Sequence, residues 1–286
     1  MTSRHSDVTV VVTNFNYARY LGEAVASALD QDGGRPHVIV VDDGSTEPGT
    51  DDVLAGLDDD VTVVRQANQG LPGARNTGLR MATTPYLVVL DADDRLRPAA
   101  LDVMRGPLDA DPNLGFSYGL TTFFGDWDGV LTMPPYDPFK LLYRHMIGST
   151  CLFRRELFDQ VGGYDPEFRG YEDWEFWVHA LAHGWQGLRV DVPTFDYRRH
   201  GSTMLSGARK SYRHWYRRLR RKHHALYARD SELARASGVG RVEQAVYRYW
   251  WGARPLPARV ELALHAILWR ATSRSGADRP PASATG

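Results

Sequence analysis

The sequence predicts an α/β fold in which a mostly parallel β-sheet is flanked by helices, with a helical extension at the C-terminal side. Short runs of consecutive apolar residues alternate with amphipathic segments over roughly the first 200 residues. These runs are apolar throughout, so the strands should be buried on both faces, as is typical of parallel strands connected by helices. A change of charge near residue 208 predicts the extension.

The predicted elements follow one another in a regular order. A helix is expected at residues 17–29, where Tyr17, Leu21 and Val25 share one apolar stripe. A second helix should begin about Pro72, because proline is favoured in the first turn. The strands are predicted at residues 8–13, 37–43, 61–64 and 86–90.

Composition limits the class of protein. The 286 residues, 43% of them hydrophobic, suffice for one large domain or two small ones. The single cysteine excludes an internal disulfide and a cysteine-rich zinc site. The first residues, MTSRHSDVTV, do not resemble a signal peptide, and no apolar run has the length of a membrane span. A soluble protein in the reducing cytoplasm is therefore expected.

Charge divides the chain into two parts. The net charge is −1, but from Arg209 onward there are 17 lysines and arginines against 5 acidic residues. The first 208 residues hold 17 basic and 30 acidic residues. We therefore predict a main domain at residues 1–207, a basic amphipathic helical extension at 208–274 and a disordered tail at 275–286.

Clusters of carboxylates follow two of the predicted strands. Asp42 and Asp43 come after the second strand, and Asp91, Asp93 and Asp94 come after the fourth. They could lie in a solvated loop or form a ligand site. Because ligands of such sheets bind at the carboxyl ends of the strands, a site is the favoured interpretation. One or two carboxylates, completed by substrate phosphates, are typical ligands of Mg²⁺ or Mn²⁺.

The stretch NQGLPGARNTGLR, residues 68–80, indicates an anion. Its glycines lead into a helix whose early turns carry Arg75 and Asn76, which could hold phosphate oxygens. The alternative is that Arg75 merely pairs with a surface acid. No dinucleotide fingerprint and no P-loop lysine is present. Together these features predict a nucleotide diphosphate linked to the protein through a metal on Asp93.

Six segments, in order, resemble one family. They are VTVVVTNFNYARYL, VIVVDDGST, NQGLPGARNTGL, YLVVLDADDRLRP, LFRRELFDQVGGYDPEF and YEDWEFW. The chain resembles, over roughly residues 8–205, the inverting nucleotide-sugar glycosyltransferases of family-two type with the GT-A fold. The resemblance implies transfer of a hexose or related sugar from a nucleotide diphosphate, of the UDP type, to an acceptor hydroxyl, and makes residues 1–207 the catalytic domain.

The resemblance also implies roles for single residues on the donor side. Asp91 and Asp93 would form the DxD motif that binds ribose and metal, with His200 as a further metal or diphosphate contact. The nucleoside and diphosphate would be bound by the remaining residues of this set: Thr13, Asn14, Asp43, Arg75 and Asn76.

On the acceptor side, Asp173 of YEDWEFW matches the family's catalytic base, with Glu172 as the substitute. The chemistry requires a base, because the acceptor hydroxyl must lose a proton as it attacks. A carboxylate at a helix N-terminus tends to stay ionised. Alternatively, Glu172 and Asp173 only cap the helix that follows.

The basic extension has two interpretations. Residues 209–227 place Tyr212, Trp215, Tyr216 and Leu219 on one helical stripe among arginines. This stripe could pack on the acidic main domain, or it could attach the protein to the inner, anionic face of a membrane that carries a lipid-linked acceptor. Binding to nucleic acid is not expected, because the sequence shows no nucleic-acid recognition module.

Two other functions remain open at the sequence level. The chain could be a catalytically silent subunit that binds nucleotide sugars, or a nucleotidyltransferase. Release of a nucleoside diphosphate would identify the glycosyltransferase, whereas release of pyrophosphate would identify the nucleotidyltransferase. The acceptor could be a sugar, a lipid-linked molecule or another small molecule.

Overall fold

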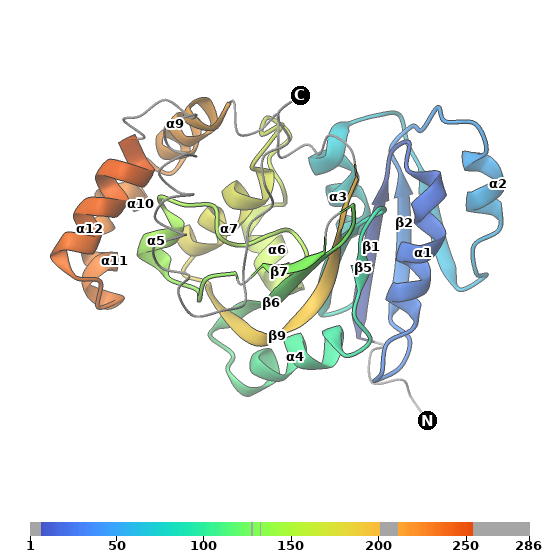
Figure 1. The fold of residues 1–286 in the computed structure, drawn as a ribbon, viewed down its shortest axis with the longest axis horizontal. Coiled ribbons are helices and arrows are strands. Elements are labelled where there is room, and N and C mark those ends of the chain that lie inside the picture. Colours follow the sequence, from blue (N-terminus) through green and yellow to red (C-terminus); the bar gives the residue numbers. More distant parts are fainter. Residues whose placement is uncertain (1–6, 127, 132, 201–210, 254–286) are drawn as a thin grey trace.

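The structure is a computed structural model that describes residues 7–126, 128–131, 133–200 and 211–253. Within these ranges, nine strands form one sheet in the order β3-β2-β1-β4-β8-β6-β9-β5, with β7 paired to β6. Helices cover the sheet, and a group of further helices lies at the end opposite α1 and α2 (Figure 1). The predicted boundary near residue 207 and the predicted tail at 275–286 lie outside the described ranges.

The first half of the sheet is parallel, as the sequence predicts. Continuous apolar runs form its strands, and alternate side chains of β1 enter two different cores. Val11 packs on the side of α3, whereas Val10 and Val12 pack on the side of α1. The elements of this half are β1 (Val8–Asn14), α1 (Ala18–Leu29), β2 (His37–Asp42), α2 (Thr50–Ala55), β3 (Val61–Arg65), α3 (Gly70–Met81) and β4 (Tyr86–Asp91).

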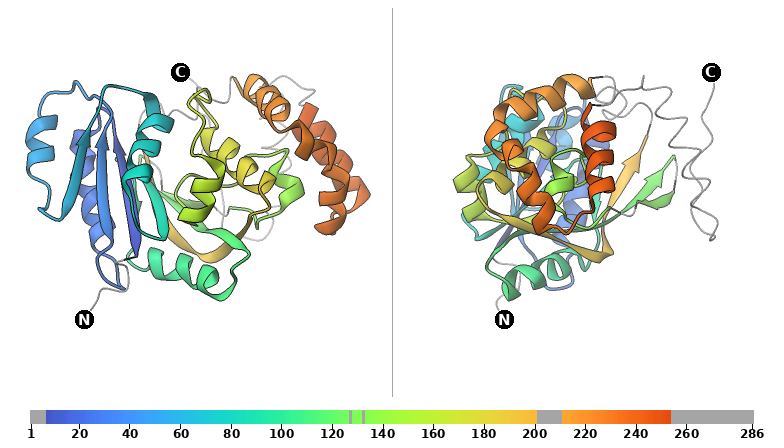
Figure 2. Two further views of the ribbon diagram at one scale, coloured as in Figure 1. Left: turned by 180° about the vertical axis from the view of Figure 1, so that it is seen from behind. Right: turned by 90° about the vertical axis from the view of Figure 1, so that its left-hand side faces the viewer.

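The second half makes the sheet mixed. β8 joins β4 in antiparallel direction, with Leu87 opposite Phe153, and β6 and β9 form a long parallel pair that curves away from the first strands. The view from behind shows this curvature (Figure 2). The elements are β5 (Arg95–Leu96), α4 (Ala100–Ala110), β6 (Leu114–Gly125), β7 (Gly129–Leu131), α5 (Pro138–Leu141), β8 (Leu152–Arg154), α6 (Arg155–Val161), α7 (Glu172–Ala182) and β9 (Gln186–Arg199).

The extension packs against α7. The rings of Tyr212 and Tyr216 stack on Trp174, with centroids 5.6 and 5.9 Å away, and Leu219 is buried beside them. The apolar stripe predicted at 209–227 is therefore directed inward. The elements of the extension are α9 (Tyr212–Lys222), α10 (His224–Ala228), α11 (Asp230–Ala236), α12 (Arg241–Val246) and a π-helix (Tyr247–Ala253).

A buried charge also joins the extension to the main domain. Glu175 of α7 has no exposed surface, and its Oε1 lies 2.7 Å from His223 Nε2 and 2.9 Å from Lys222 Nζ. Burial would raise the pKa of Glu175, but these two partners lower it below its ordinary value. The extension thus supplies the positive charge that keeps a carboxylate of α7 ionised.

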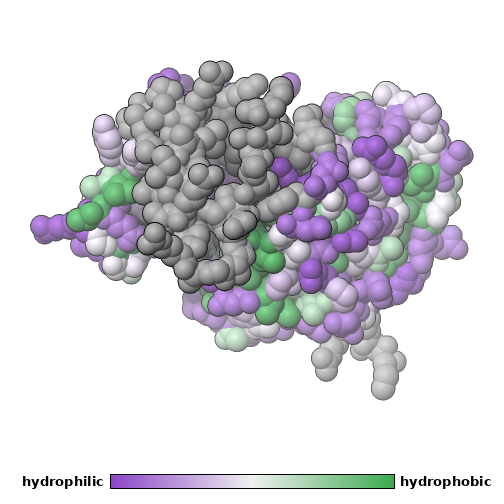
Figure 3. Space-filling view, viewed as in Figure 1, coloured by the Kyte–Doolittle hydropathy of each residue, from purple (hydrophilic) through white to green (hydrophobic). Residues whose placement is uncertain are grey.

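The surface of the first half is mainly hydrophilic in the view of Figure 3, whereas hydrophobic side chains appear at the left edge, over the helical extension. The exposed hydrophobic residues of the extension include Val242 and Val246 of α12 and Tyr249 of the π-helix. Within the described ranges, no helix combines the length and the apolarity needed to cross a membrane.

Shortening Leu219 should destabilise the protein, because this side chain is only 1% exposed and packs in the same core as α7. Leu219→Ala should lower the free energy of unfolding by about 2–5 kcal/mol. The measurement is urea denaturation followed by circular dichroism. Val242→Ala is the matched control in the same extension. Val242 is 81% exposed, so its truncation should change stability by less than about 0.5 kcal/mol. Equal, small effects of both substitutions would contradict a shared core.

Candidate active site

The carboxyl ends of β1, β2 and β4 meet at one edge of the sheet. Backbone hydrogen bonds continue beyond the strands: Asp43 N donates to Asn14 O at 2.8 Å, and Ala92 N donates to Thr13 O at 3.1 Å. The structure therefore brings together Thr13, Asn14, Asp43 and Asp91, four of the residues that the sequence predicts for the donor site. Parallel strands produce this arrangement, since their carboxyl ends share an edge.

The side chains of Thr13 and Asn14 donate hydrogen bonds to carboxylates. Thr13 Oγ1 donates to Asp91 Oδ1 at 3.2 Å, and Asn14 Nδ2 donates to Asp42 Oδ1 at 2.9 Å. Asn14 is 1% exposed, and its Oδ1 is buried without a hydrogen-bond partner in the described part of the chain. An unpaired buried acceptor is costly, and this oxygen is itself shielded from solvent.

Asp43 fixes the loop that leads into α3. Its Oδ1 accepts hydrogen bonds from Gln66 Nε2 at 2.7 Å and from the backbone N–H of Gln69 at 2.8 Å. The next residue, Gly44, has φ of +75°, and a Cβ atom there would lie 2.9 Å from Asn68 N. The turn after β2 thus requires glycine and holds the Asp43 carboxylate at the sheet edge.

Arg75 is a buried cation of the site. Its side chain is 2% exposed and lies between two carboxylates. Nη2 donates to Oδ1 and Oδ2 of Asp91, at 2.9 and 3.1 Å, and Nη1 donates to Glu172 Oε1 at 3.1 Å. Burial would lower the pKa of Arg75, but Asp91 and Glu172 raise it, so the guanidinium stays charged.

The two side chains of α3 that were predicted to bind phosphate, Arg75 and Asn76, contact protein groups in this structure. The guanidinium of Arg75 is occupied by protein carboxylates, in line with the alternative that it pairs with acids, although the pair is buried rather than at the surface. Asn76 holds the backbone of Tyr164, donating to its carbonyl at 2.7 Å and accepting from its N–H at 2.8 Å. A donor contact of either residue stays a prediction.

Asp93 and His200 are far apart in the chain but lie together. Asp93 Oδ2 is 2.9 Å from His200 Nε2, and the imidazole packs on the rings of Tyr17 and Tyr20. Burial raises the pKa of Asp93, the negative charge of Asp91 raises it further, and His200 opposes both. Negative charge is therefore concentrated beside these two side chains, which favours a cation.

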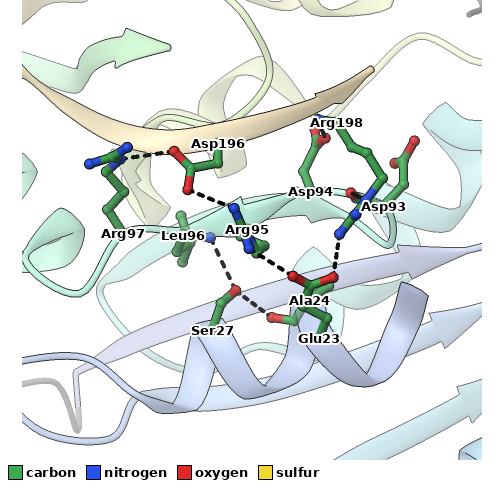
Figure 4. A network of polar contacts seen from close by, with 10 residues as sticks. All are labelled: Glu23, Ala24, Ser27, Asp93, Asp94, Arg95, Leu96, Arg97, Asp196 and Arg198. Carbon is green, nitrogen blue, oxygen red and sulfur yellow. Dashed lines mark hydrogen bonds and ion pairs between the residues drawn. The ribbon is translucent and has the colours of Figure 1, made fainter. Parts of the chain in front are cut away.

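The loop that carries these carboxylates is held rigidly. Asp94 is buried and accepts a hydrogen bond from the backbone N–H of Arg198 at 2.8 Å, while Arg198 Nε donates to the carbonyl of Asp93 at 2.8 Å. Arg198 also pairs with Glu23 of α1, which in turn binds Arg95 (Figure 4). Asp94 thus supports the loop from within, whereas Asp93 is directed away from this network.

The predicted metal ligands are only partly arranged to bind a divalent cation. In the described ranges, no group of three or more histidine, cysteine, aspartate or glutamate residues is arranged to hold a metal ion. Of the predicted set, Asp93 and His200 are in contact, but both oxygens of Asp91 are bound to Arg75. A hard cation at Asp93 would therefore need oxygen ligands from a substrate, which is how Mg²⁺ is commonly held.

The second group of the site lies at the N-terminus of α7. The residue before this helix, Tyr171, adopts φ of +60°, so the chain turns sharply before Glu172 and Asp173. Asp173 Oδ1 accepts a hydrogen bond from Trp174 N at 2.8 Å, and Oδ2 lies 2.9 Å from His145 Nε2. Burial would raise the pKa of Asp173, but His145 and Arg75 lower it below the ordinary value.

The two adjacent acids of α7 differ in their electrostatics. Burial raises the pKa of Glu172 to about 7, although Arg75 opposes the shift. The side chain of Asp173 is 17% exposed and that of Glu172 is 10% exposed. Asp173 is thus the acid that is both ionised at neutral pH and accessible, whereas Glu172 is paired with Arg75 inside the protein. The residue at the N-cap of α7 is Tyr171, without a side-chain capping hydrogen bond, so Glu172 and Asp173 lie in the first turn rather than at the cap.

Sequence reasoning missed His145. This residue lies in the segment between α5 and β8, 28 residues before Asp173, in a stretch without a motif. Only the tertiary structure places its ring against Tyr171 and Trp174, with centroids 5.5 and 6.3 Å away. The sequence offers one weak signal, an isolated histidine among apolar residues.

Glu172→Gln should change how stability depends on pH. A carboxyl group with a raised pKa in the folded state stabilises the fold fully below its unfolded pKa of about 4.5, and this contribution is lost as the pH rises through about 7. Relative to wild type, the variant should therefore gain on the order of 2–3 kcal/mol between pH 4.5 and 7.5. Urea denaturation at several pH values measures this difference.

The control for that experiment is Glu156→Gln, which removes an exposed glutamate from α6. Its effect on the free energy of unfolding should stay below about 0.5 kcal/mol at every pH. A constant difference between wild type and Glu172→Gln would show that Glu172 ionises in the folded protein as it does in the unfolded chain.

Comparisons with known proteins agree with this geometry. The family model described as "Glycosyl transferase family 2" matches residues 9–162, and "Glycosyltransferase like family 2" matches residues 133–230. The succinoglycan biosynthesis protein ExoO of Rhizobium meliloti is 40% identical over 196 residues, which are 62% of this chain and 56% of ExoO. The teichuronic acid biosynthesis protein TuaG of Bacillus subtilis, a putative glycosyltransferase by name, is 27% identical over 234 residues, 78% of this chain and 92% of TuaG.

Coverage of the curated relatives is partial in several cases. The chain spans about half of ExoO and 30% of an uncharacterized Nostoc glycosyltransferase that is 41% identical over 98 residues.

Among solved structures, S. aureus TarS with UDP-GlcNAc has a TM-score of 0.65 at 16% identity. The match covers 89% of this chain and 77% of the TarS chain. The Pyrobaculum calidifontis mannosyltransferase PcManGT, with GDP-Man and Mn²⁺, has a TM-score of 0.61 at 22% identity, covering 92% and 80%.

The structural likenesses establish the fold, and the family model, which matches more than half of the chain, establishes the family. The predicted α/β class of GT-A type and the predicted family are both confirmed. The chain belongs to glycosyl transferase family 2, and its fold is of the GT-A type.

Proposed function

We propose that this glycosyltransferase moves a sugar from a nucleotide diphosphate to an acceptor hydroxyl with inversion at the anomeric carbon, and that Asp173 is the general base. The observation that carries the proposal is the pairing of two acidic centres by one buried arginine. Arg75 joins Asp91, at the end of β4, to Glu172, the neighbour of Asp173. A donor site and a base are thereby held at a fixed separation.

The donor is proposed to bind at the carboxyl ends of β1, β2 and β4. Structural neighbours are known with UDP, UDP-GlcNAc and GDP-Man, which supports a nucleotide-diphosphate sugar, and we propose a UDP-type donor. Thr13, Asn14 and Asp43 lie at this edge, where a backbone hydrogen bond joins Asn14 to Asp43. A thermal-shift panel of nucleotide sugars, repeated with Mn²⁺ and with chelator, would identify the donor.

A divalent metal, Mg²⁺ or Mn²⁺, is proposed at Asp93 and His200, with Asp91 adjacent. The mannosyltransferase neighbour contains Mn²⁺ together with its donor. A cation there would neutralise charge that develops on the departing diphosphate. In this chain, Arg198 and Asp94 keep the loop of Asp93 in place, so the carboxylate is oriented before the donor arrives.

Asp173 is proposed to accept the proton of the attacking hydroxyl. In an inverting reaction the hydroxyl approaches the anomeric carbon from the face opposite the leaving diphosphate, and the base must lie on that side. His145 and Arg75 lower the pKa of Asp173, so the carboxylate is ready to accept a proton at neutral pH. No observation in the described residues favours nucleotidyl transfer instead.

The acceptor is proposed to be a hydroxyl of a sugar, a lipid-linked molecule or another small molecule. Contact with a membrane through residues 209–227 stays a prediction from the sequence. Because the apolar stripe of α9 packs inward, such a contact would depend on exposed arginines, among them Arg217 and Arg221. The expected cytoplasmic location likewise stays a prediction.

Asp93→Asn should remove the metal-dependent part of donor binding. The variant retains the size of the side chain but loses the charge that attracts the cation. We expect transfer to fall by about two to three orders of magnitude, as for loss of one electrostatic stabiliser. Calorimetric titration of UDP with and without Mn²⁺ measures the binding, and wild type in chelator is the control. Full activity of wild type in chelator would remove the metal from the mechanism.

Asp173→Asn should separate catalysis from binding. Asparagine conserves size and can still accept the hydrogen bond of Trp174 N, so donor affinity should change little. Transfer should fall by about two to four orders of magnitude, the usual contribution of a positioned general base. Release of nucleoside diphosphate in the presence of a panel of saccharide acceptors measures it. Glu172→Gln should be milder, and a dead Glu172→Gln beside an active Asp173→Asn would reassign the base by one position.

A further inference from the structure

His145 is a histidine outside every sequence motif, yet it contacts the acid to which we assign the proton transfer. It lies between α5 and β8, and its side chain is 22% exposed. Asp173 Oδ2 lies 2.9 Å from its Nε2, and the carbonyl of Ile147 lies 2.9 Å from the same nitrogen. The rings of Tyr171 and Trp174 pack beside the imidazole.

The two contacts determine where the proton of this imidazole resides. A backbone carbonyl oxygen can only accept a hydrogen bond, and an ionised carboxylate can only accept as well. Nε2 faces one of each, so it must carry hydrogen in the neutral ring as well as in the imidazolium. His145 is therefore a fixed donor toward Asp173, and Nδ1 is the nitrogen that gains or loses the proton.

The carboxylate of Asp173 is thus held at both oxygens. Oδ1 accepts from the backbone N–H of Trp174 at 2.8 Å, and Oδ2 faces His145. Two donors fix the plane of a carboxylate that would otherwise rotate, and each oxygen keeps a further lone pair for the acceptor hydroxyl. Proteins commonly orient a general base through a hydrogen bond from a neighbouring side chain.

We propose that His145 is a positioning residue for Asp173: its Nε2–H orients the carboxylate and keeps it in the ionised form that accepts the acceptor's proton. The proposal rests on the proposed function, in which Asp173 is the base. It adds a residue that determines how well that base works at mildly acidic pH.

Other charged and titratable groups around the pair act in known directions. Glu172 on α7 pairs with Arg75 on α3, and it carries a full negative charge only above its raised pKa of about 7. Cys151 and Tyr164 lie near Asp173, and burial raises the pKa of both. Burial would lower the pKa of His145, but Asp173 raises it above the ordinary value, and Glu172 acts in the same direction. The imidazole and the carboxylate therefore stabilise each other's charged forms.

The first test requires no substrate. Long-range ¹H–¹⁵N NMR of histidine-labelled full-length protein reports the tautomer and the pKa of each imidazole, and His145→Gln assigns the signal. We expect His145 to be the Nε2–H tautomer and its pKa to fall by about one unit or more in Asp173→Asn, because the negative charge is lost. An Nδ1–H tautomer, or an unchanged pKa in Asp173→Asn, would overturn the proposal.

The second test separates positioning from folding. His145→Gln keeps an N–H donor near the position of Nε2 without the charge, whereas His145→Ala removes both. We expect transfer to fall by about 10- to 100-fold in His145→Ala and less in His145→Gln, with UDP affinity unchanged in both. The acidic limb of the kcat/KM profile should move to higher pH by about one unit in both variants, because Asp173 then protonates more easily.

The outcomes distinguish this proposal from the proposed function. If Asp173→Asn transfers sugar at the wild-type rate, the base assignment fails, and His145 loses its role with it. If Asp173→Asn is inactive but the pH profile of His145→Ala matches wild type, Asp173 remains the base and only the role of His145 fails. Thermal denaturation of each variant confirms that the comparison is made on folded protein.

Discussion

The buried ion pairs of Arg75 are the constraint on which the rest of the site depends. One guanidinium, 2% exposed, neutralises Asp91 at the end of β4 and Glu172 at the start of α7. Removing a partner from such a group would leave an uncompensated charge inside the protein, at a cost of about 3–5 kcal/mol. The sheet edge and the helix N-terminus are therefore held at one separation. A transfer reaction needs this, because an error of about 1 Å in the position of reacting groups can cost two orders of magnitude in rate.

Much of the fold follows from the sequence because the interactions that determine it are local. Continuous apolar runs predict β1, β2 and β4, and the carboxylates after them predict where side chains would gather. The helix that begins at Glu172 is likewise visible in the acids of its first turn and in its apolar residues. In each case the signal lies within about ten residues, and the topology of parallel strands supplies the rest.

The remaining features depend on contacts between distant parts of the chain. Asn76 binds the backbone of Tyr164, and His145 reaches Asp173, without any pattern that marks them as pairs. The antiparallel addition of β8 to β4 is also long-range. For α9, periodicity identifies an apolar stripe but not its partner, since the same stripe would fit lipid or protein. The structure shows protein, in the form of Trp174, on which Tyr212 and Tyr216 stack.

The two acidic centres differ in how the protein treats their charge. At Asp93, burial and the neighbouring Asp91 raise the pKa, so the protein itself disfavours the ionised form and a cation would be stabilised there. At Asp173, the partners outweigh burial and lower the pKa. The first centre thus gains most from an incoming positive charge, whereas the second is already compensated by His145 and Arg75. Arg75 connects the two centres, because it binds Asp91, the neighbour of the first, and lowers the pKa of Asp173 in the second.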